Sequence, residues 1–231
     1  MMTDVIAAIV LAAGNSSRME GDDKLWADLG GKPVVSRSLE SLIELAVLNI
    51  LVIVSPSSRH KELRKLIRRP KTLELRFVEG GDRRQDSVAA GIAAAAEADW
   101  YLVHDGARPL ATVELSAAVL DAARLYGAAI PGVPVTDTLK RVHDNRKIIE
   151  TVNRTPLRAI QTPQAFSGDV LREAHKKIRG DVTDDAAMVE ELGYPVALVE
   201  GETTNLKVTR KTDLLIARTF FEAKSNTQRG R

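Results

Sequence analysis

The loop that follows the first apolar run of the chain holds the residues best suited to chemistry. The stretch VLAAGNSSRMEGDDKL, residues 10–25, combines small residues with two cations, Arg18 and Lys24. Small residues let backbone N–H groups approach an anion, and the two cations can reach one polyphosphate. The stretch is not a Walker A motif, because no Gly-Lys-Ser or Gly-Lys-Thr closes it, and it lacks two glycines of the dinucleotide fingerprint. It predicts a phosphate-binding loop, with a plain turn carrying solvated charges as the alternative.

A second loop, EGGDRRQDSV at residues 79–88, follows another apolar run in the same way. Its paired glycines permit unusual backbone angles, and Asp82 and Ser87 offer hydrogen-bonding groups at the start of a helix. The loop is compatible with ligand recognition, but a simple capped helix also explains it.

A third loop, VHDGARP at residues 103–109, ends an apolar run in Asp105 and adds Arg108 three residues later. A carboxylate and a guanidinium at the end of a strand indicate a site at the edge of a sheet. The alternative is an Asp–Arg pair that only holds the loop in place.

The order of apolar runs and amphipathic segments predicts the scaffold that carries these loops. Continuous apolar runs are typical of strands covered on both faces, and they alternate here with segments of helical periodicity. We therefore predict an α/β fold with a doubly wound, mainly parallel sheet and a ligand crevice at the carboxyl ends of its strands. The predicted strands are 5–12, 49–55, 73–79, 100–105, 128–135 and 195–201, and the predicted helices are 34–48, 84–97, 112–126, 168–178, 184–193 and 211–223.

One segment interrupts this alternation. In DTLKRVHDNRKIIETVN, residues 137–153, apolar residues flank a polar HDNR turn, which predicts a β-hairpin. A two-stranded hairpin is only marginally stable alone in water, so we expect the arm, about residues 136–156, to pack against a partner surface.

Composition narrows the class of protein. The 231 residues are 44% hydrophobic and 28% charged, as in ordinary globular proteins, and predict a single domain over 1–231. Thirty-three Lys and Arg against 31 Asp and Glu give a net charge of +2, which argues against nucleic acid or an anionic membrane as a partner. The absence of cysteine excludes disulfides, thiolate zinc sites and a cysteine nucleophile, and agrees with a cytoplasmic location.

Other features of the sequence have simpler explanations. The apolar run at residues 5–13 is too short to span a bilayer, so we expect no membrane association. The basic segment 59–71 has no aromatic residue for base stacking and is expected to be a solvated helix face. The four histidines show no metal-ligand spacing, and His104 is expected to be a structural hydrogen-bonding residue. In the TDD sequence at 183–185, Thr183 can cap the following helix, which explains the aspartates without a metal.

The motifs together resemble the 2-C-methyl-D-erythritol 4-phosphate cytidylyltransferases of the non-mevalonate isoprenoid pathway. The resemblance rests on LAAGNSSRM with Lys24, EGGDRRQDSV, LVHDGARP, PVTDTLKR, QTPQAF, TDDAAMVE and VEGETTNLKVT, in this order over nearly the whole chain. It implies a Rossmann-like nucleotidyltransferase fold and transfer of CMP from CTP to a phosphomonoester, a small phosphorylated polyol. Pyrophosphate would be released, and Mg²⁺ would be bound with CTP.

The resemblance also implies roles for individual residues. The implied catalytic residues are Arg18 and Lys24 at the α-phosphate and Arg154 and Lys207 at the acceptor phosphate. The implied nucleotide-binding residues are Ala12, Ala13, Gly14, Gly81, Asp82, Ser87, Asp105 and Gly106, and the implied acceptor-binding residues are Asp105, Arg108, Thr138, Arg154, Thr162, Thr183 and Lys207. In this family the hairpin arm embraces a second subunit, so the resemblance also implies a homodimer in which Arg154 acts in trans.

Two alternative functions stay open at this stage. One is a cytidylyltransferase for a pentitol phosphate such as ribitol 5-phosphate, and the other is a nucleotide-binding module without turnover. The chain departs from the family pattern at Leu11, Ser16, Leu25–Trp26 and Gly106, where alanine is more usual, but it keeps both Arg18 and Lys24. The change at Gly106 is expected to be harmless, because the contact implied there is made by the backbone.

Overall fold

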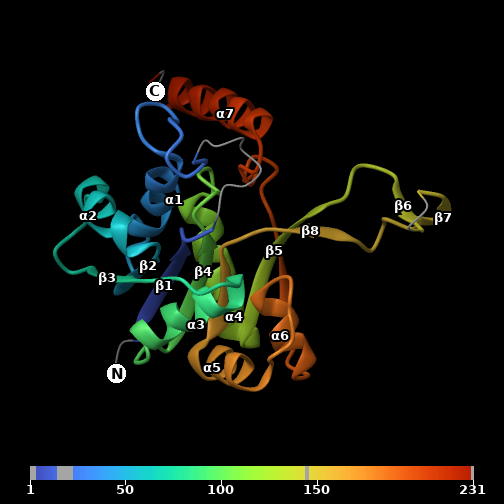
Figure 1. Cartoon of the computed structure of the whole chain (residues 1–231), viewed down its shortest axis with the longest axis horizontal. Coiled ribbons are helices and arrows are strands. Elements are labelled where there is room, and N and C mark those ends of the chain that lie inside the picture. The colour runs from blue at the N-terminus through green and yellow to red at the C-terminus, as the bar shows by residue number, and fades with distance from the viewer. Residues whose placement is uncertain (1–3, 15–22, 144–145, 230–231) are drawn as a thin grey trace.

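The computed structural model describes residues 4–14, 23–143 and 146–229, the last five of these by their backbone only. In this part of the chain, strands and helices alternate along an α/β fold built on one large sheet (Figure 1). The sheet has eight strands. Seven of them lie side by side in the order β10-β5-β9-β4-β1-β2-β3, and β8 pairs with β5. They are β1 (Ile6–Leu11), β2 (Ile50–Val54), β3 (Glu74–Val78), β4 (Trp100–Asp105), β5 (Ala128–Pro134), β8 (Arg158–Ile160), β9 (Gln164–Ser167) and β10 (Ala197–Glu200).

The sheet is mainly parallel, as the sequence predicts. The pairs β1–β2, β1–β4, β2–β3 and β5–β10 are all parallel. Strands β8 and β9, which the apolar pattern does not reveal, run antiparallel to their neighbours, and β9 lies between β4 and β5. The carboxyl ends of β1 and β4 therefore lie at the same edge of the sheet, with Leu11 opposite Asp105.

Helices cover both faces of the sheet, which confirms the doubly wound arrangement. The helices are α1 (Val34–Ile43), α2 (Ser57–Leu66), α3 (Arg84–Ala94), α4 (Val113–Tyr126), α5 (Gly168–Lys177), α6 (Asp185–Glu191) and α7 (Lys211–Arg229). Residues of α1, α2 and α4 pack against one set of strand side chains, which includes Ala8 and Val10. Residues of α3, α5 and α6 pack against the alternating set, which includes Ala7 and Ile9. The period of two along β1 thus divides the core into two layers.

The last helix extends the fold beyond the sheet. Helix α7 continues to Arg229, further than the predicted 211–223. Its Ala217 is fully buried in a third apolar cluster with Leu29, Val34, Leu110 and Val208. This cluster joins α7 to the segment before α1 and to the loop after β4. None of the helices within the described ranges combines the length and apolar character needed to cross a membrane.

The predicted hairpin is present as a separate two-stranded sheet. Strands β6 (Leu139–Val142) and β7 (Ile148–Val152) pair antiparallel, with Leu139 opposite Val152. The arm extends away from the large sheet, to the right in Figure 1. Its residues Val142 and Ile148 are 59% and 63% exposed, so much of its apolar surface has no cover within this chain. The division of the chain into a single domain over residues 1–231 stays a prediction.

Candidate active site

The loops after β1 and β4 lie against each other at the carboxyl edge of the sheet. The Gly106 amide donates a hydrogen bond to the Leu11 carbonyl at 3.0 Å. A Cβ atom at position 106 would lie only 2.8 Å from that carbonyl oxygen, so an alanine there would force these two loops of this chain to shift. The sheet register thus places the predicted phosphate loop beside the predicted Asp105 loop.

The loop before α3 joins them as the third wall. A Cβ atom at Gly80 would lie 2.5 Å from Cβ of Ala13, so here too a glycine allows two loops to approach. Ser87 Oγ accepts a hydrogen bond from the Gly81 amide at 3.2 Å, which fixes the turn before the helix.

The start of α3 is capped, but by residues other than those the sequence indicated. Asp86 accepts a hydrogen bond from the backbone amide of Arg83 at 3.2 Å and pairs with the Arg83 guanidinium at 2.7 Å. The Arg83 hydrogen bonds hold the pKa of Asp86 below its ordinary value. Since Arg83 and Asp86 form the cap, capping does not account for Asp82, which lies on the wall of a cavity.

These three loops surround a cavity of about 510 Å³, which we name the nucleotide cavity. It brings together the predicted residues Ala13, Gly14, Lys24, Gly81, Asp82, Ser87, Asp105, Gly106 and Lys207. Ala12 does not line it and is buried in the core, at 8% exposure. Arg18 lies outside the described residues. Lys24 and Lys207 give this cavity cationic groups suited to a polyphosphate.

A second cavity, of about 400 Å³, adjoins the first and is named the acceptor cavity. It is lined by the predicted residues Asp105, Arg108, Thr162, Thr183 and Lys207, together with Arg84, Gln161, Gln164 and Asp184. Arg84, Asp105 and Lys207 line both cavities, so the two spaces meet at these three side chains. A group bound in one cavity is therefore within reach of a group bound in the other.

Asp105 is the electrostatic centre of the junction. Its Oδ2 lies 2.8 Å from Lys207 Nζ and 3.7 Å from Arg108 Nε, and its Oδ1 lies 3.7 Å from Arg84 Nε. Burial raises the pKa of this carboxyl group, but the charges of Lys207, Arg84 and Arg108 outweigh that effect and bring the pKa to about 2. Asp105 is therefore ionised at neutral pH, and its carboxylate is surrounded by three cationic side chains.

Arg108 has a structural role besides facing the acceptor cavity. Its Nη1 donates to the Asn205 carbonyl at 2.7 Å, and its Nη2 donates to the Ile160 carbonyl at 3.3 Å. Burial lowers the pKa of Arg108, and the charge of Asp105 partly offsets this effect. The sequence left open whether Asp105 and Arg108 form a site or hold a loop. Arg108 lines the cavity and also holds the loop.

His104 supports this loop from behind, as the sequence indicated. Its Nδ1 lies 3.0 Å from Thr162 Oγ1, and its Nε2 lies 3.2 Å from the Arg108 carbonyl. The Thr162 hydroxyl also accepts a hydrogen bond from the Asp105 amide at 3.0 Å. Burial lowers the pKa of His104 to about 4, so the ring is neutral at physiological pH. It therefore joins Thr162 to the loop with Arg108 through hydrogen bonds, without adding a charge.

The start of α6 corrects one expectation from the sequence. The helix cap is Asp184, which accepts a hydrogen bond from the Ala187 amide at 3.0 Å, and not Thr183. Asp184 Oδ2 also accepts a hydrogen bond from Gln164 Nε2 at 2.8 Å. This second bond fixes Asp184 at the cap, which leaves Thr183 at the mouth of the acceptor cavity.

Asp185 does not belong to the cap either. Its side chain is fully buried, 2.6 Å from Arg84 Nη1 and 3.0 Å from His175 Nε2. Burial raises its pKa, but the hydrogen bond with His175 and the charge of Arg84 outweigh this, so the pKa lies below its ordinary value. Sequence reasoning missed Arg84, His175 and Asp185, because the pairing of Arg84 with Asp185 joins residues 101 positions apart.

Two predicted site residues lie away from both cavities. Thr138 and Arg154 are exposed residues of the hairpin arm, and Arg154 Nη1 donates a hydrogen bond to the Thr136 carbonyl. Neither lines the nucleotide cavity or the acceptor cavity of its own chain.

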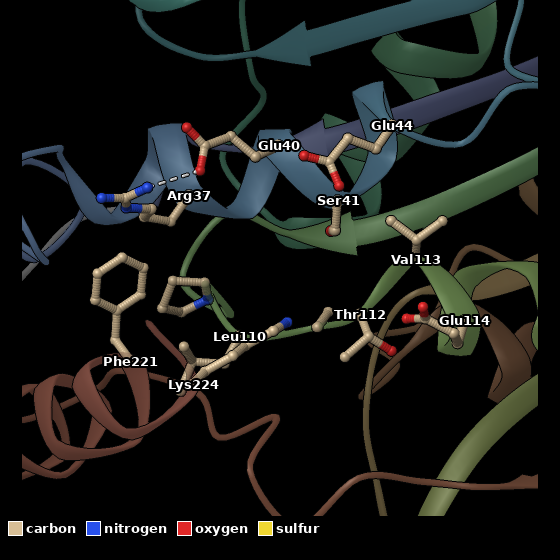
Figure 2. A pocket seen from close by; sticks show the side chains of 12 residues that line it. Arg37, Glu40, Ser41, Glu44, Leu110, Thr112, Val113, Glu114, Phe221 and Lys224 are labelled. Carbon is tan, nitrogen blue, oxygen red and sulfur yellow. Dashed lines mark hydrogen bonds and ion pairs between the residues drawn. The ribbon is translucent and has the colours of Figure 1, made fainter. Parts of the chain in front are cut away.

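A further cavity, of about 540 Å³, lies between α1, the loop after β4 and α7 (Figure 2). Its wall contains Glu40, Glu44 and Glu114, and the Arg37 guanidinium lies 4.2 Å from the centre of the Phe221 ring and pairs with Glu40. None of the predicted site residues that the structure describes lines it, and its three carboxylates outnumber its two cations, Arg37 and Lys224, which makes it less suited to a polyphosphate. We therefore assign the chemistry to the two cavities that meet at Asp105.

Comparisons with known proteins show similarity to one named family. A profile of the family described as 2-C-methyl-D-erythritol 4-phosphate cytidylyltransferase matches residues 6–223. Proteins of that name from Dehalococcoides mccartyi strain CBDB1 and Rhodococcus jostii are 36% and 39% identical over 217 and 219 residues. The alignments cover 94% of this chain in both cases and 96% and 95% of those proteins.

Solved structures show the same similarity. A crystal structure named for the same activity, from Thermus thermophilus, is 36% identical with a TM-score of 0.75, over 92% of this chain and 96% of that one. The crystal structure of a 4-diphosphocytidyl-2C-methyl-D-erythritol synthase from Anaerococcus prevotii has a TM-score of 0.83 at 27% identity, over 96% and 100% of the two chains.

Proposed function

The chain belongs to the 2-C-methyl-D-erythritol 4-phosphate cytidylyltransferase family, and we propose that its two cavities hold the two substrates of that family's reaction. The protein is a nucleotidyltransferase (EC 2.7.7.60) that transfers a cytidylyl group from CTP to 2-C-methyl-D-erythritol 4-phosphate. The products are 4-diphosphocytidyl-2-C-methyl-D-erythritol and pyrophosphate. A pentitol phosphate as acceptor is not favoured, because the named relatives act on methylerythritol phosphate. The observation that carries the proposal is the pair of adjoining cavities that share Asp105 and Lys207.

The acceptor supplies its own nucleophile. A phosphomonoester has a second pKa of ~6 and is largely a dianion at neutral pH, so its oxygen can attack the α-phosphorus without a protein base. The obstacle is repulsion between two polyanions, and the task of the protein is to position them and to balance their charge. We assign the α-phosphate to Lys24 in the nucleotide cavity, assisted by Arg18, and the acceptor phosphate to Lys207.

The nucleotide cavity also has groups for selecting the base and sugar. The loop with Gly81, Asp82 and Ser87 offers acceptors and donors suited to the exocyclic amine and the ring carbonyl of cytosine. Asp105 and Gly106 line the same cavity at the carboxyl end of β4, where we place the ribose. In-line attack then runs from the acceptor cavity across the junction, with pyrophosphate leaving on the far side.

Magnesium is the cofactor that we expect, and it is proposed to arrive with CTP. Within the part of the chain that the structure describes, no three His, Cys, Asp or Glu side chains are grouped to hold a metal ion. Both oxygens of Asp105 already face cations, which makes it a poor ligand. These residues do not fit a metal held by the protein itself, so the triphosphate oxygens would supply most of the ligands of the ion.

We also propose that the protein acts as a twofold-symmetric homodimer joined by the hairpin arms. The arm exposes Val142, Ile148 and Ile149, which are 57% to 63% accessible in the single chain. Since about 60% of each remains to be buried, covering such residues with a second copy would be favourable by roughly 1–2 kcal/mol each. A partner would also explain why Thr138 and Arg154 lie far from the cavities of their own chain. A cytoplasmic location is a further proposal, which rests on the absence of cysteine.

Pyrophosphate release tests the assignment of substrates. The purified protein would be given CTP with 2-C-methyl-D-erythritol 4-phosphate, ribitol 5-phosphate or erythritol 4-phosphate, each as the only acceptor. We expect the first to give the highest kcat/KM. Faster turnover of ribitol 5-phosphate would contradict the choice of acceptor, and CTP binding without pyrophosphate release from any acceptor would indicate a non-catalytic nucleotide-binding module.

A further inference from the structure

A continuous line of charged and hydrogen-bonded side chains connects the junction of the cavities to the interior. Lys207 binds Asp105 at 2.8 Å, Asp105 faces Arg84 at 3.7 Å, Arg84 binds Asp185 at 2.6 Å, and Asp185 contacts His175 at 3.0 Å. Arg84 is the first residue of α3 and Asp185 the first residue of α6, so the line also joins the two helices that begin at the nucleotide and acceptor cavities.

Arg84 is the link between the two carboxylates. It presents Nε to Asp105 and Nη1 to Asp185, while its Nη2 is buried and has no hydrogen-bond partner in the described part of the chain. The charges of Asp185 and Asp105 outweigh burial and keep the pKa of Arg84 above its ordinary value. This guanidinium is therefore a permanent charge that is held firmly on one side and only loosely, at 3.7 Å, on the side of Asp105.

Lys207 has two competing partners in the proposed reaction. In this structure its ammonium group is bound by Asp105, yet the proposed function requires it to bind the acceptor phosphate. Its side chain is 41% exposed, so it has room to turn toward the acceptor cavity. When it turns, Asp105, which is only 11% exposed, loses its closest counter-charge, and a buried unpaired charge is costly.

The remaining cations at Asp105 are not equivalent. Arg108 is tied to the carbonyl groups of Asn205 and Ile160, which limits its movement. Among the described residues, Arg84 is anchored through Asp185, at the far end of its guanidinium, and could close the 3.7 Å gap to Asp105 by a small shift.

We propose that Arg84 is a positioning residue that becomes the closest counter-charge of the Asp105 carboxylate when Lys207 turns to the acceptor phosphate. Asp185, backed by His175, keeps Arg84 within reach of Asp105. The proposal rests on the proposed function, because it assumes that Lys207 binds the acceptor phosphate. Without Arg84, the release of Lys207 would leave Asp105 with Arg108 alone, so the acceptor would bind less tightly.

Steady-state kinetics of Arg84→Gln test this role. We expect the KM for 2-C-methyl-D-erythritol 4-phosphate to rise about tenfold or more, while the KM for CTP rises by less than about threefold. Arg84→Lys, which keeps the charge but cannot span two carboxylates, should give a smaller rise for the acceptor. If Arg84 acted only by adding positive charge, its loss would raise the KM for CTP at least as much as the KM for the acceptor, because the triphosphate carries more charge. That result would overturn the proposal. Arg124→Gln, at a surface ion pair with Asp4, is the matched control and should change neither KM.

A double-mutant cycle separates a role through Lys207 from a merely structural one. In a Lys207→Gln background there is no ammonium group to release, so adding Arg84→Gln should raise the acceptor KM by less than about twofold. If the two effects multiply instead, Arg84 does not act through Lys207 and the proposal fails. Lys207→Gln alone tests the proposed function, since an unchanged acceptor KM in that variant would remove Lys207 from the phosphate site. Thermal unfolding of each variant shows whether it is folded. If Arg84→Gln is not, Arg84→Lys replaces it in the cycle, and whatever rise in acceptor KM it causes in wild type should be absent in the Lys207→Gln background; a rise of the same factor in both backgrounds overturns the proposal.

Discussion

The proposed sharing of active sites between two chains can be tested by mixing two inactive variants. Lys24 lines the nucleotide cavity of its own chain, whereas Arg154 lies on the arm and lines neither cavity. If Arg154 acts in trans, a hybrid of Lys24→Ala and Arg154→Ala chains has one site with both defects and one site with none. Random exchange of equal amounts makes half of the dimers hybrid, so about a quarter of all sites regain both residues. The mixture should therefore recover about a quarter of wild-type kcat per site, measured by pyrophosphate release.

The control is each variant incubated with itself under the same conditions, which should stay inactive. Native mass spectrometry measures the hybrid fraction, and the recovered activity should equal half of that fraction at every mixing ratio. If Arg154 acts within its own chain, every site keeps one defect. No recovery in a sample with confirmed hybrids would thus refute the shared site, while leaving the cytidylyltransferase function in place.

Three further predictions concern single residues at the junction of the loops. Lys24→Ala should lower kcat by on the order of 10²-fold with a much smaller change in CTP affinity, and a change confined to KM in steady-state kinetics would contradict its role at the α-phosphate. Gly106→Ala should lower the melting temperature, because the new Cβ would lie 2.8 Å from the Leu11 carbonyl, and an unchanged melting temperature would show that the loops separate freely. The pKa of Asp105 is depressed to about 2, so its contribution to stability is complete above the unfolded value of 3.8 and is lost as the pH falls toward 2. Urea titrations should show wild type losing about 2 kcal/mol more than Asp105→Asn between pH 4 and 2, and parallel losses would argue against this charge cluster.

The sequence was sufficient to predict the elements whose pattern is local. The continuous apolar runs of β1, β2 and β4 and the helical spacing along α1 gave the doubly wound sheet and the edge where its loops meet. The loop with Gly80 and Gly81 and the loop with Asp105 could be placed together, because parallel strands bring their carboxyl ends to the same side.

Features that depend on distant partners could not be predicted in this way. Strand β9 is short and runs antiparallel between two strands far from it in sequence, so no periodicity marks it. Thr183 and Asp184 are both good capping residues, and the choice of Asp184 depends on Gln164, twenty residues earlier. The side chain of Asp185 looks like that of any acidic residue in a first helical turn until Arg84 and His175 are placed beside it.

The position of β9 has a consequence for how the protein forms during synthesis. Strands β1 to β4 come from the first 105 residues and are paired with one another in the order β4-β1-β2-β3, so this half of the sheet can assemble before the later strands are translated. Strand β5 cannot pair with its neighbours as soon as it is made, because β8, β9 and β10 are all translated after it. Until Gln164–Ser167 emerges, the outer edge of β4 is unpaired and can bind a strand from another nascent chain. We expect the acceptor half to be the last to fold, and nascent chains stalled before β9 to be the species that chaperones must protect.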